Sequence, residues 1–592
     1  MKRLMTGNEA VARGAWEAGV RFASAYPGTP STEILETLAE YKDDVKAEWG
    51  VNEKVAFEAT MGAAIAGARS LASMKHVGLN VAADPLFSMA YTGTNGGFVV
   101  VTADEPGQHS SQNEQDNRNY ASFAKVPLFE PSDSQECLDM VKEAFRVSEE
   151  FSTPVIVRLT TRISHSKGIV DCSEREDVAI REYVKEASRY VGVPANARKR
   201  RVAVEERQER LKGYSENSPL NREERNGSDV GVISSGCAYY FAKEVFGDKA
   251  SYLKLGFTQP MPTGKIRDFC ASVKTIYVIE ENDPIIENQV RLLGFDCRGK
   301  NLFPYNGEMT SDVIRAAVYG KTFESAEADP AKVAPRPPSL CAGCPHRGLF
   351  YELGKRKNVM ISGDIGCYSL AYAEPYNAMD LAVCMGASIS AGHGAQQVFD
   401  MRTDNAPRVV SVLGDSTFFH TGINSLLMVA YNGSRSVNII LDNRITGMTG
   451  HQQNPGSGYT LQGEPAPEID LEALVKACGI QNVRTIDPNN LKQVRETLDW
   501  ALALDEASVI ITRWPCALKK FSPQDKEEFA GAFTSTYKVN VDLCIGCKAC
   551  IRSGCPAISF DPETKKSGID ANQCVGCGVC AQICPKHAIV KE

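Results

Sequence analysis

The feature that most constrains this chain is a set of eight cysteines between Cys544 and Cys584. They form two triplets with three-residue steps, each followed by a Cys-Pro: Cys544-x2-Cys547-x2-Cys550-x4-Cys555-Pro556 and Cys574-x2-Cys577-x2-Cys580-x3-Cys584-Pro585. Three thiolates at this spacing can ligate three irons of one 4Fe-4S cluster. The cysteine of the distant Cys-Pro supplies the fourth ligand. Zinc ribbons use isolated Cys-x2-Cys pairs, so the tandem triplets favour two 4Fe-4S clusters over zinc.

The tail resembles the two-cluster ferredoxins, in which the fourth cysteine of each run ligates the other cluster. The resemblance implies two ligand sets: Cys544, Cys547, Cys550 and Cys584, and Cys574, Cys577, Cys580 and Cys555. The first run departs from the bacterial pattern by one residue before Cys555, which affects the expected potential more than the ligands. Residues 535–592 are therefore predicted to be a ferredoxin-like α+β domain that conducts electrons.

The composition of the rest of the chain is that of an ordinary core-forming protein. Of 592 residues, 43% are hydrophobic and 23% charged, and the formal net charge is 65 − 73 = −8. The other eleven of the nineteen cysteines are scattered, which excludes a secreted disulfide scaffold and indicates a reducing cytoplasm. Mild acidity argues against nucleic-acid binding, and no apolar run is long enough for a membrane helix or a signal peptide.

Alternating strand-like and helix-like segments predict several α/β domains with parallel sheets and helices on both faces. The expected boundaries are 1–170 for the first domain, 171–228 for a charged, solvated connector, 229–325 for a second α/β domain, 326–340 for a Pro-rich linker and 341–520 for a third α/β domain.

The third domain contains a complete β-α-β pattern with a polar residue just past each strand. Asp415 follows the first strand and Asn443 follows the next, 28 residues later. Because parallel strands joined by a right-handed crossover can lie side by side, both oxygens can reach one point outside the sheet. A carboxylate, an amide oxygen and a backbone carbonyl suit Mg²⁺ with phosphate oxygens, and a helix N-terminus can face the same diphosphate.

These residues resemble the thiamine diphosphate motif, Gly-Asp-Gly followed about thirty residues later by Asn. Here the motif is Gly414-Asp415-Ser416 and Asp442-Asn443, with Ile445 where the family uses a backbone carbonyl. Ser416 in place of the second glycine is a departure that either crowds the diphosphate or donates a hydrogen bond to it. The resemblance implies thiamine diphosphate and Mg²⁺ as cofactors.

A thiamine enzyme also needs a glutamate from a pyrimidine-binding domain, whose carboxylate hydrogen-bonds the aminopyrimidine ring and promotes proton transfer. Two glutamates near the start of one predicted helix are candidates. Glu53 stands nine residues before Gly62 in the family's register, with a Gly-Ala-Arg step following, and Glu58 stands nine before Gly67 without that step. Glu53 is preferred, and Glu58 remains the alternative.

The segment Tyr26-Pro27-Gly28-Thr29-Pro30-Ser31 resembles the Tyr-Pro-x-Thr-Pro-Ser signature of the 2-oxoacid:ferredoxin oxidoreductases. We expect Thr29 to cap a helix that begins at Pro30. The resemblance implies that Thr29 lies by the substrate carboxylate, and that Arg118 in the loop HSSQNEQDNRN is a bidentate carboxylate clamp. A polar surface loop is the alternative interpretation of that segment.

The order of domains is similar to the large subunits of this family, specifically those that act on aryl 2-oxoacids such as indolepyruvate. The resemblance spans essentially the whole chain. It implies a thiamine-dependent enzyme that converts an aryl 2-oxoacid to an acyl-CoA and CO2 and reduces an external ferredoxin, with a transketolase-C-terminal-like fold at 229–325. A smaller β subunit is implied, because no sequence here completes the thioester-forming site. Pyruvate, 2-oxoglutarate and phenylglyoxylate remain alternative substrates.

Four more cysteines are candidates for a third cluster beside the thiamine site: Cys341, Cys344, Cys367 and Cys516. Buried structural thiols are the alternative, since a lone Cys-x2-Cys is weakly specific. His346 and His420 flank the same region and could serve acid–base chemistry, a diphosphate hydrogen bond or the core. Two other functions stay open: a non-redox thiamine decarboxylase or ligase, and a non-catalytic electron-transfer or scaffold subunit.

Overall fold

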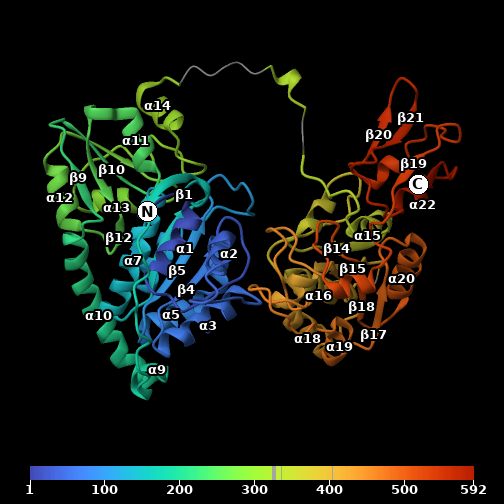
Figure 1. Ribbon diagram of the computed structural model, residues 1–592, viewed down its shortest axis with the longest axis horizontal. Helices are drawn as coiled ribbons and strands as arrows, with labels where there is room; N and C mark the ends of the chain where they lie inside the picture. The colour runs from blue at the N-terminus through green and yellow to red at the C-terminus, as the bar shows by residue number, and fades with distance from the viewer. Residues whose placement is uncertain (323–328, 335–336, 403) are drawn as a thin grey trace. The chain divides into compact units, whose positions relative to one another are not determined.

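The computed structural model describes residues 1–322, 329–334, 337–402 and 404–592 (Figure 1). These fall into two compact units, Met1–Ala328 and Asp329–Glu592. The linker predicted at 326–340 lies partly outside the described residues.

A seven-stranded sheet forms the centre of the first unit, in the order β12-β6-β7-β5-β4-β2-β3. Every neighbouring pair is parallel except β12 with β6. The strands are β2 (Phe22–Ala25), β3 (Lys46–Trp49), β4 (Ser70–Lys75), β5 (Phe98–Asp104), β6 (Leu128–Phe129), β7 (Val155–Thr160) and β12 (Phe257–Gln259). The chain runs from β2 to β3 on one side and then returns to β4 on the other, so a topological switch point lies between β2 and β4.

Helices cover both faces of this sheet. On one face, Phe98 and Val100 of β5 pack in a core with α3 (Glu53–Ile65) and α5 (Ala83–Thr92). Since side chains alternate along a strand, Val99 and Val101 point to the opposite face. There α7 (Ser134–Phe151) packs on the sheet and on α1 (Gly7–Glu17). All of β5 is buried, as expected for a central parallel strand.

The second α/β segment contributes to the same unit. Its own sheet has the order β13 (Thr275–Ile279), β10 (Val230–Ser235), β11 (Ser251–Leu255), β9 (Arg222–Glu224), with β9 antiparallel. Strand β12 comes from this segment but pairs with β6 of the first sheet. The two α/β segments are therefore joined by a shared sheet edge as well as by the connector.

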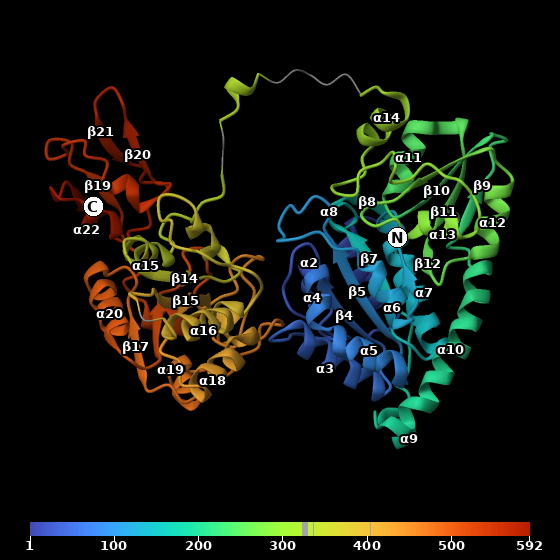
Figure 2. The same cartoon turned by 180° about the vertical axis from the view of Figure 1, so that it is seen from behind.

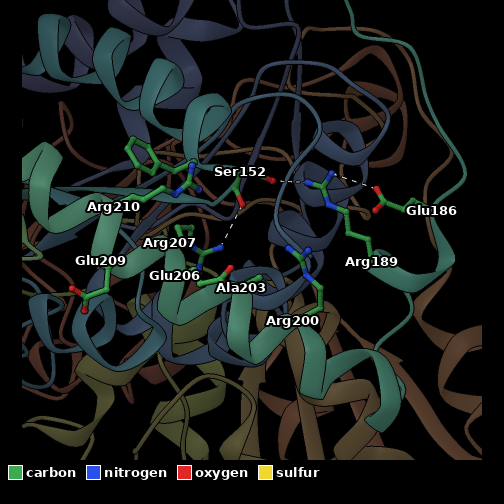
Figure 3. A pocket seen from close by; sticks show the side chains of 10 residues that line it. Ser152, Glu186, Arg189, Arg200, Ala203, Glu206, Arg207, Glu209 and Arg210 are labelled. Atoms are coloured by element: carbon green, nitrogen blue, oxygen red, sulfur yellow. Dashed lines mark hydrogen bonds and ion pairs between the residues drawn. The ribbon is translucent and has the colours of Figure 1, made fainter.

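The charged connector forms α9 (Ala187–Tyr190) and the long helix α10 (Pro194–Asn217). Its arginines bind the last carbonyls of α5: Arg189 to Thr92 (3.0 Å), Arg200 to Tyr91 (2.8 Å) and Arg207 to Ala90 (2.8 Å). Cations here stabilise the negative end of the helix dipole. Figure 3 shows the pocket of about 640 Å³ beside them, where Ser152 contacts both Arg189 and Arg207. The connector is thus less solvated than the sequence predicts.

The second unit is built on a fully parallel sheet in the order β14 (Val359–Ser362), β15 (Arg408–Gly414), β16 (Val437–Asp442), β18 (Ser508–Arg513), β17 (Asn482–Ile486). Ile439 and Leu441 of β16 pack with α15 (His346–Leu353) and α20 (Leu491–Ala503). Ile440 packs on the other face with α18 (Ile423–Tyr431) and α19 (Leu471–Ala477). Helices therefore cover both faces, which confirms the predicted α/β class.

The cysteine-rich tail forms a small lobe at one end of the second unit, drawn in red in both views (Figures 1 and 2). Strand β19 (Tyr537–Val539) pairs with β22 (Ile589–Lys591), and β20 (Ile558–Asp561) pairs with β21 (Lys566–Ile569). The helical turn η5 (Cys550–Ser553) and the helix α22 (Val579–Ile583) carry cysteines between these strands.

Candidate active site

The two halves of the Asp–Asn motif lie on neighbouring strands. Gly414 at the end of β15 is in register with Leu441 near the end of β16, and the strands are parallel. Asp415 and Asn443 therefore emerge at the same edge of the sheet, and both side chains are buried. Ser416 bridges the halves, because its hydroxyl accepts a hydrogen bond from Thr446 Oγ1 (2.8 Å).

Asp415 is held in place by neutral donors. Its carboxylate accepts hydrogen bonds from the backbone N–H of Ser416 (2.8 Å) and from Asn454 Nδ2 (3.2 Å). Burial raises the pKa of Asp415 to about 7, and the nearby charge of Asp442 adds to the rise. Asn443 Oδ1 accepts from the backbone N–H of Ile445 (3.2 Å). A divalent cation at this edge would compensate the buried carboxylate.

The helix after Asp415 is irregular. Asp415 opens the short helix α17 (Asp415–Thr417), which continues as a π-helical turn, η4 (Phe418–Gly422), before α18. His420 lies in that turn and is buried, with Nδ1 3.3 Å from Thr421 Oγ1. Such turns inside a helix are frequent at functional sites.

Asp364 is a buried acid that the sequence analysis missed. It accepts hydrogen bonds from the backbone N–H groups of Gly386 and Ser388, both at 3.0 Å, and so fixes the start of α16 (Ala387–Asp400). Burial raises its pKa to about 6. The only available signal was an Asp-Ile-Gly-Cys step after a strand, which has no distinctive spacing.

The fold brings together the four cysteines Cys341, Cys344, Cys367 and Cys516, hereafter the inner cysteine group. Burial raises the pKa of Cys344 to about 12, and Cys367 and Cys516 contribute further. Burial likewise raises the pKa of Cys367 to about 11, with contributions from Cys516 and Cys341. These mutual interactions place all four thiols in one region of the second unit.

The inner cysteine group lies against Asn443. The backbone N–H of Cys516 donates to the Asn443 carbonyl (3.0 Å). Gly447 packs against both Cys367 and Asn443. A Cβ added to this glycine would stand 3.9 Å from Cys367 Sγ and 3.8 Å from Asn443 Nδ2. His346 also reaches this point, with Nε2 3.5 Å from Asn443 Nδ2, and burial lowers its pKa to about 4. His346 is therefore neutral at pH 7.

The eight tail cysteines separate into two groups of four. Cys544, Cys547, Cys550 and Cys584 line one pocket, hereafter the outer cysteine group. In the second group, burial raises the pKa of Cys580 to about 12, with further contributions from Cys577, Cys555 and Cys574 and a smaller one from Cys550 of the outer group; Cys580, Cys577, Cys555 and Cys574 are the middle cysteine group. Each group thus combines a triplet with the Cys-Pro cysteine of the other run. Gly554, directly before Cys555, ends η5 with φ +64°. Across the described ranges, no cluster of three or more His, Cys, Asp or Glu side chains could hold a single metal ion.

In the first unit, three strands end at the switch point of the sheet. Strand β2 leads into the Tyr26–Ser31 motif, β4 ends at Lys75 and β5 ends beside Glu105. The expectation that Thr29 caps a helix beginning at Pro30 is wrong. The Thr29–Pro30 peptide is cis, and α2 (Thr32–Leu38) begins two residues later with Ser31 as its N-cap residue. Thr29 therefore lies in a loop of the crevice where α/β folds bind ligands.

The two candidate glutamates have different environments. Glu53 is the first residue of α3 and only 5% exposed. Its carboxylate packs directly against Gly78, because a Cβ added to that glycine would lie 2.8 Å from Glu53 Oε1. The Glu58 side chain is 40% exposed and pairs with Lys54 on the helix surface. A group that binds a buried aminopyrimidine must itself be enclosed, so the geometry favours Glu53.

Arg118 lacks the environment that a substrate clamp requires. It is 3% exposed, and its guanidinium bonds the Asp116 carboxylate, Glu280 Oε2 (2.7 Å) and the carbonyls of Glu281 (2.8 Å) and Asp283 (2.9 Å). Two of these acceptors are carboxylates, so the guanidinium charge is already neutralised within the protein and would attract a substrate carboxylate only weakly. In the structure Arg118 joins the first α/β segment to the second, and this arrangement argues against the clamp role.

Lys75 is a cation at the switch point that the sequence analysis missed. Its Nζ lies 3.8 Å from Glu105 Oε2 and donates to the Ser110 carbonyl (3.3 Å), and its side chain is 13% exposed. A Cβ on Gly28 would meet Lys75 Cγ at 3.2 Å, so the lysine stem covers the motif that carries Thr29. Burial lowers the pKa of Lys75. Only the strand order reveals this placement, since Lys75 belongs to no motif.

No helix among the described residues is long and apolar enough to span a bilayer. Three family models match the chain. "Pyruvate flavodoxin/ferredoxin oxidoreductase, thiamine diP-bdg" matches residues 13–220. "Thiamine pyrophosphate enzyme, C-terminal TPP binding domain" matches 364–512, and "4Fe-4S dicluster domain" matches 536–585.

Full-length relatives decide the family. The indolepyruvate oxidoreductase subunit IorA of Archaeoglobus fulgidus is 40% identical, with 99% of this chain and 97% of the relative covered. The IorA subunit of Methanothermobacter thermautotrophicus is 41% identical over 100% and 97%. The chain belongs to the indolepyruvate oxidoreductase IorA family. A 2-oxoglutarate synthase subunit KorA of Methanothermobacter marburgensis is 27% identical over 47% of this chain and 87% of its own length.

Membership of the IorA family confirms the predicted enzyme class, with a thiamine-diphosphate-binding domain and a 4Fe-4S dicluster domain. Glu53 and Lys75 fall inside the match at 13–220, and Asp415 and Asn443 fall inside the match at 364–512. Cys341, Cys344 and Cys516 lie outside the second match, so they are identified only by the structure's grouping of them. The IorA relatives are named as subunits, which implies a further subunit in their enzymes.

Proposed function

We propose that this chain is the catalytic subunit for ferredoxin-dependent oxidative decarboxylation of indolepyruvate and related aryl 2-oxoacids. The 2-oxoacid and coenzyme A thiol give acyl-CoA, CO2, one proton and two electrons. The C–C bond to the carboxylate breaks, a thioester bond forms, and two external ferredoxins each accept one electron. The substrate class follows the printed names of the IorA relatives.

One observation carries this proposal: the inner cysteine group touches the Asp415–Asn443 edge through the Cys516–Asn443 hydrogen bond. A cofactor that releases two electrons at one carbon needs an acceptor that takes them singly. Cysteines gathered beside the thiamine-type motif supply the ligands of such an acceptor. A non-redox decarboxylase has no use for this arrangement.

The donors at the Asp415 edge fit Mg²⁺ and a diphosphate. We propose that Asp415 Oδ2, the Asn443 side chain and the Ile445 carbonyl hold Mg²⁺, with Gly414 and Ser416 beside the diphosphate and His420 as a further hydrogen-bonding group. These are the hard oxygen ligands that magnesium prefers. Thiamine diphosphate, when bound, supplies the carbanion chemistry that decarboxylation needs. We assign to Glu53 the carboxylate that holds and transfers a proton at the aminopyrimidine ring.

We propose three 4Fe-4S clusters, held by the inner, middle and outer cysteine groups. The pocket shared by the outer group and the mutual interactions within the other two groups support these ligand sets. We expect electrons to leave through an external ferredoxin. A smaller partner subunit is proposed to complete the thioester-forming site for coenzyme A.

For the substrate, we propose that Lys75 replaces Arg118 as the cation that binds the 2-oxoacid carboxylate, with Thr29 beside it. Lys75 lies over the loop that carries Thr29, and both lie at the crevice of the first sheet. A lysine ammonium binds a carboxylate as a compact point charge with three rotatable donors.

The test is anaerobic assay of the chain co-expressed with its partner subunit, with ferredoxin reduction as the readout. The panel contains indolepyruvate, phenylpyruvate, phenylglyoxylate, pyruvate and 2-oxoglutarate. Highest kcat/KM with the arylpyruvates is expected. Preference for pyruvate or 2-oxoglutarate would overturn the substrate class, and ferredoxin reduction by none of the five would overturn the function.

A further inference from the structure

Arg347 occupies an unusual position between two of the cysteine groups. It is 1% exposed and follows Cys344 by three residues, at the start of α15. One side of its guanidinium, Nη2, donates to the carbonyls of Leu340 (2.9 Å) and Cys341 (2.7 Å). The other side, Nη1, donates to the carbonyl of Ser553 (2.7 Å), two residues before Cys555.

Tyr376 completes this link. Its hydroxyl accepts from Arg347 Nη1 (2.6 Å) and donates to the same Ser553 carbonyl (2.6 Å). Burial raises the pKa of Tyr376 to about 12, and Cys344 of the inner group and Cys555 of the middle group also act on it. A Cβ on Gly554 would stand 2.8 Å from the Tyr376 hydroxyl, so glycine permits this close approach. Cysteines of two different groups therefore flank one Arg–Tyr pair.

Further contacts join the tail to the thiamine-type domain of the same unit. A Cβ on Gly343, between Cys341 and Cys344, would lie 2.0 Å from Val575 Cγ2, which is next to Cys574. Gln582 of α22 donates to the Asn489 carbonyl (2.7 Å) and accepts from the Leu491 N–H (3.0 Å). The docking segments of the tail thus carry middle-group cysteines, and one of the loops that they meet carries Cys341 and Cys344.

The charge of Arg347 has no carboxylate partner among the described residues, because its recorded acceptors are three backbone carbonyls and a phenol. Its charge does act on Cys344 and on Cys577 of the middle group. Burying a cation without an anion is costly. An iron–sulfur cluster with four thiolate ligands is anionic, and its potential depends on nearby charge and hydrogen bonds.

We propose that Arg347, braced by Tyr376, is a positioning residue that fixes the inner cluster against the middle cluster and places one positive charge between them. Electrons then enter the tail at the middle cluster and leave from the outer cluster. Each transfer oxidises one cluster by one electron and reduces the next, and external ferredoxin is the final acceptor. Exposure agrees with this direction, since Cys547, Leu543 and Ile545 of the outer group's loop are exposed. The inference rests on the proposed function, because both groups must hold clusters.

The test uses the full chain with its partner subunit under anaerobic conditions, with Arg347→Gln, Arg347→Lys and Tyr376→Phe. Reduction of each cluster is titrated by EPR, which also reports magnetic coupling between neighbouring clusters. Loss of the charge in Arg347→Gln should make the inner and middle clusters about tenfold harder to reduce, which is about 59 mV for a one-electron couple. The outer cluster should not change.

The remaining variants separate charge from placement. Arg347→Lys keeps the charge but not the forked donors, so we expect near-native potentials and weakened coupling. Tyr376→Phe should also weaken the coupling. Arg356→Gln is the matched control, since Arg356 lies just beyond α15 and pairs with the exposed Asp499. The control should leave potentials and coupling unchanged.

Two failures can be told apart. If the wild-type chain holds no cluster at the inner group, as judged by unchanged iron content in Cys341→Ser, the third cluster of the proposed function is wrong. If all three clusters are present but Arg347→Gln leaves their potentials and coupling native, the role of Arg347 is wrong. A shift in Arg347→Lys equal to that in Arg347→Gln would overturn the charge effect.

Discussion

The backbone N–H of Cys516 donates a hydrogen bond to the carbonyl oxygen of Asn443, at 3.0 Å. This bond joins a cysteine that follows β18 to the amide-bearing residue that follows β16, and these strands are parallel neighbours. The proposed metal ligand and the inner cysteine group therefore lie at the same edge of one sheet, so a cluster held by this group, as we propose, would lie close to the site of decarboxylation.

The inner group should bind iron without the tail clusters. In the full chain, Cys547→Ser with Cys577→Ser removes one ligand from each tail cluster. We expect iron–sulfur absorbance and a residual EPR signal from the inner cluster to remain. Adding Cys367→Ser should abolish both. Complete loss of iron in the first variant, with the fold retained by circular dichroism, would contradict this expectation.

Asp415→Ala should prevent tight binding of thiamine diphosphate with Mg²⁺. Losing a residue that merely hydrogen-bonds a metal ligand already lowers metal affinity by about 10- to 100-fold. Losing the ligand itself should cost at least as much, so we expect the affinity to fall by about 100-fold or more. Calorimetric titration of the cofactor measures this. Asp505→Ala is the control, because its side chain is 95% exposed and pairs with the surface residue Arg435 at 3.8 Å. Equal affinity in the two variants would remove Asp415 from the site.

Glu53→Gln should lower kcat by about 10²- to 10⁴-fold, because it removes the proton-transfer group at the pyrimidine ring. Glu58→Gln should leave kcat unchanged, since Glu58 pairs with Lys54 on the helix surface. The rate of CO2 release distinguishes the two. An inactive Glu58→Gln beside an active Glu53→Gln would reverse the assignment.

Lys75→Met should raise the KM for the 2-oxoacid, because a hydrogen bond to a charged group contributes about 1.5–3 kcal/mol, or roughly 10- to 150-fold. Lys75→Arg should recover part of this loss. Binding of a non-reactive arylpropionate, measured by equilibrium dialysis, should weaken in parallel. The matched control is Lys54→Met on the neighbouring helix surface. Native binding in Lys75→Met would show that another group holds the carboxylate.

Arg118→Met should destabilise the first unit by about 3–5 kcal/mol, because the buried carboxylate of Glu280 loses its cation and Asp116 keeps only the more distant Arg158. Denaturant unfolding followed by tryptophan fluorescence measures the change. Under conditions where the variant remains folded, KM for the 2-oxoacid should stay native. A large rise in KM with native stability would restore the carboxylate-clamp role that the sequence suggested.

Local sequence patterns determined much of this protein. The cysteine triplets identify the tail, because cluster ligation requires a fixed spacing along the chain. Strand and helix periodicity predict parallel sheets, and the Asp415–Asn443 spacing identifies neighbouring strand ends, since a β-α-β crossover brings them together. Relations within one such segment follow from the chain's own geometry.

Other features depended on contacts between distant segments, which no local pattern encodes. Tertiary structure gathered Cys341 and Cys516 into one group, enclosed Glu53 while leaving Glu58 on the surface, and used Arg118 in a buried ion network. It also placed Lys75 at the switch point and Arg347 between the thiamine-type domain and the tail. Burial and pairing decide what a charged side chain can bind, and both are set only when separate segments pack together.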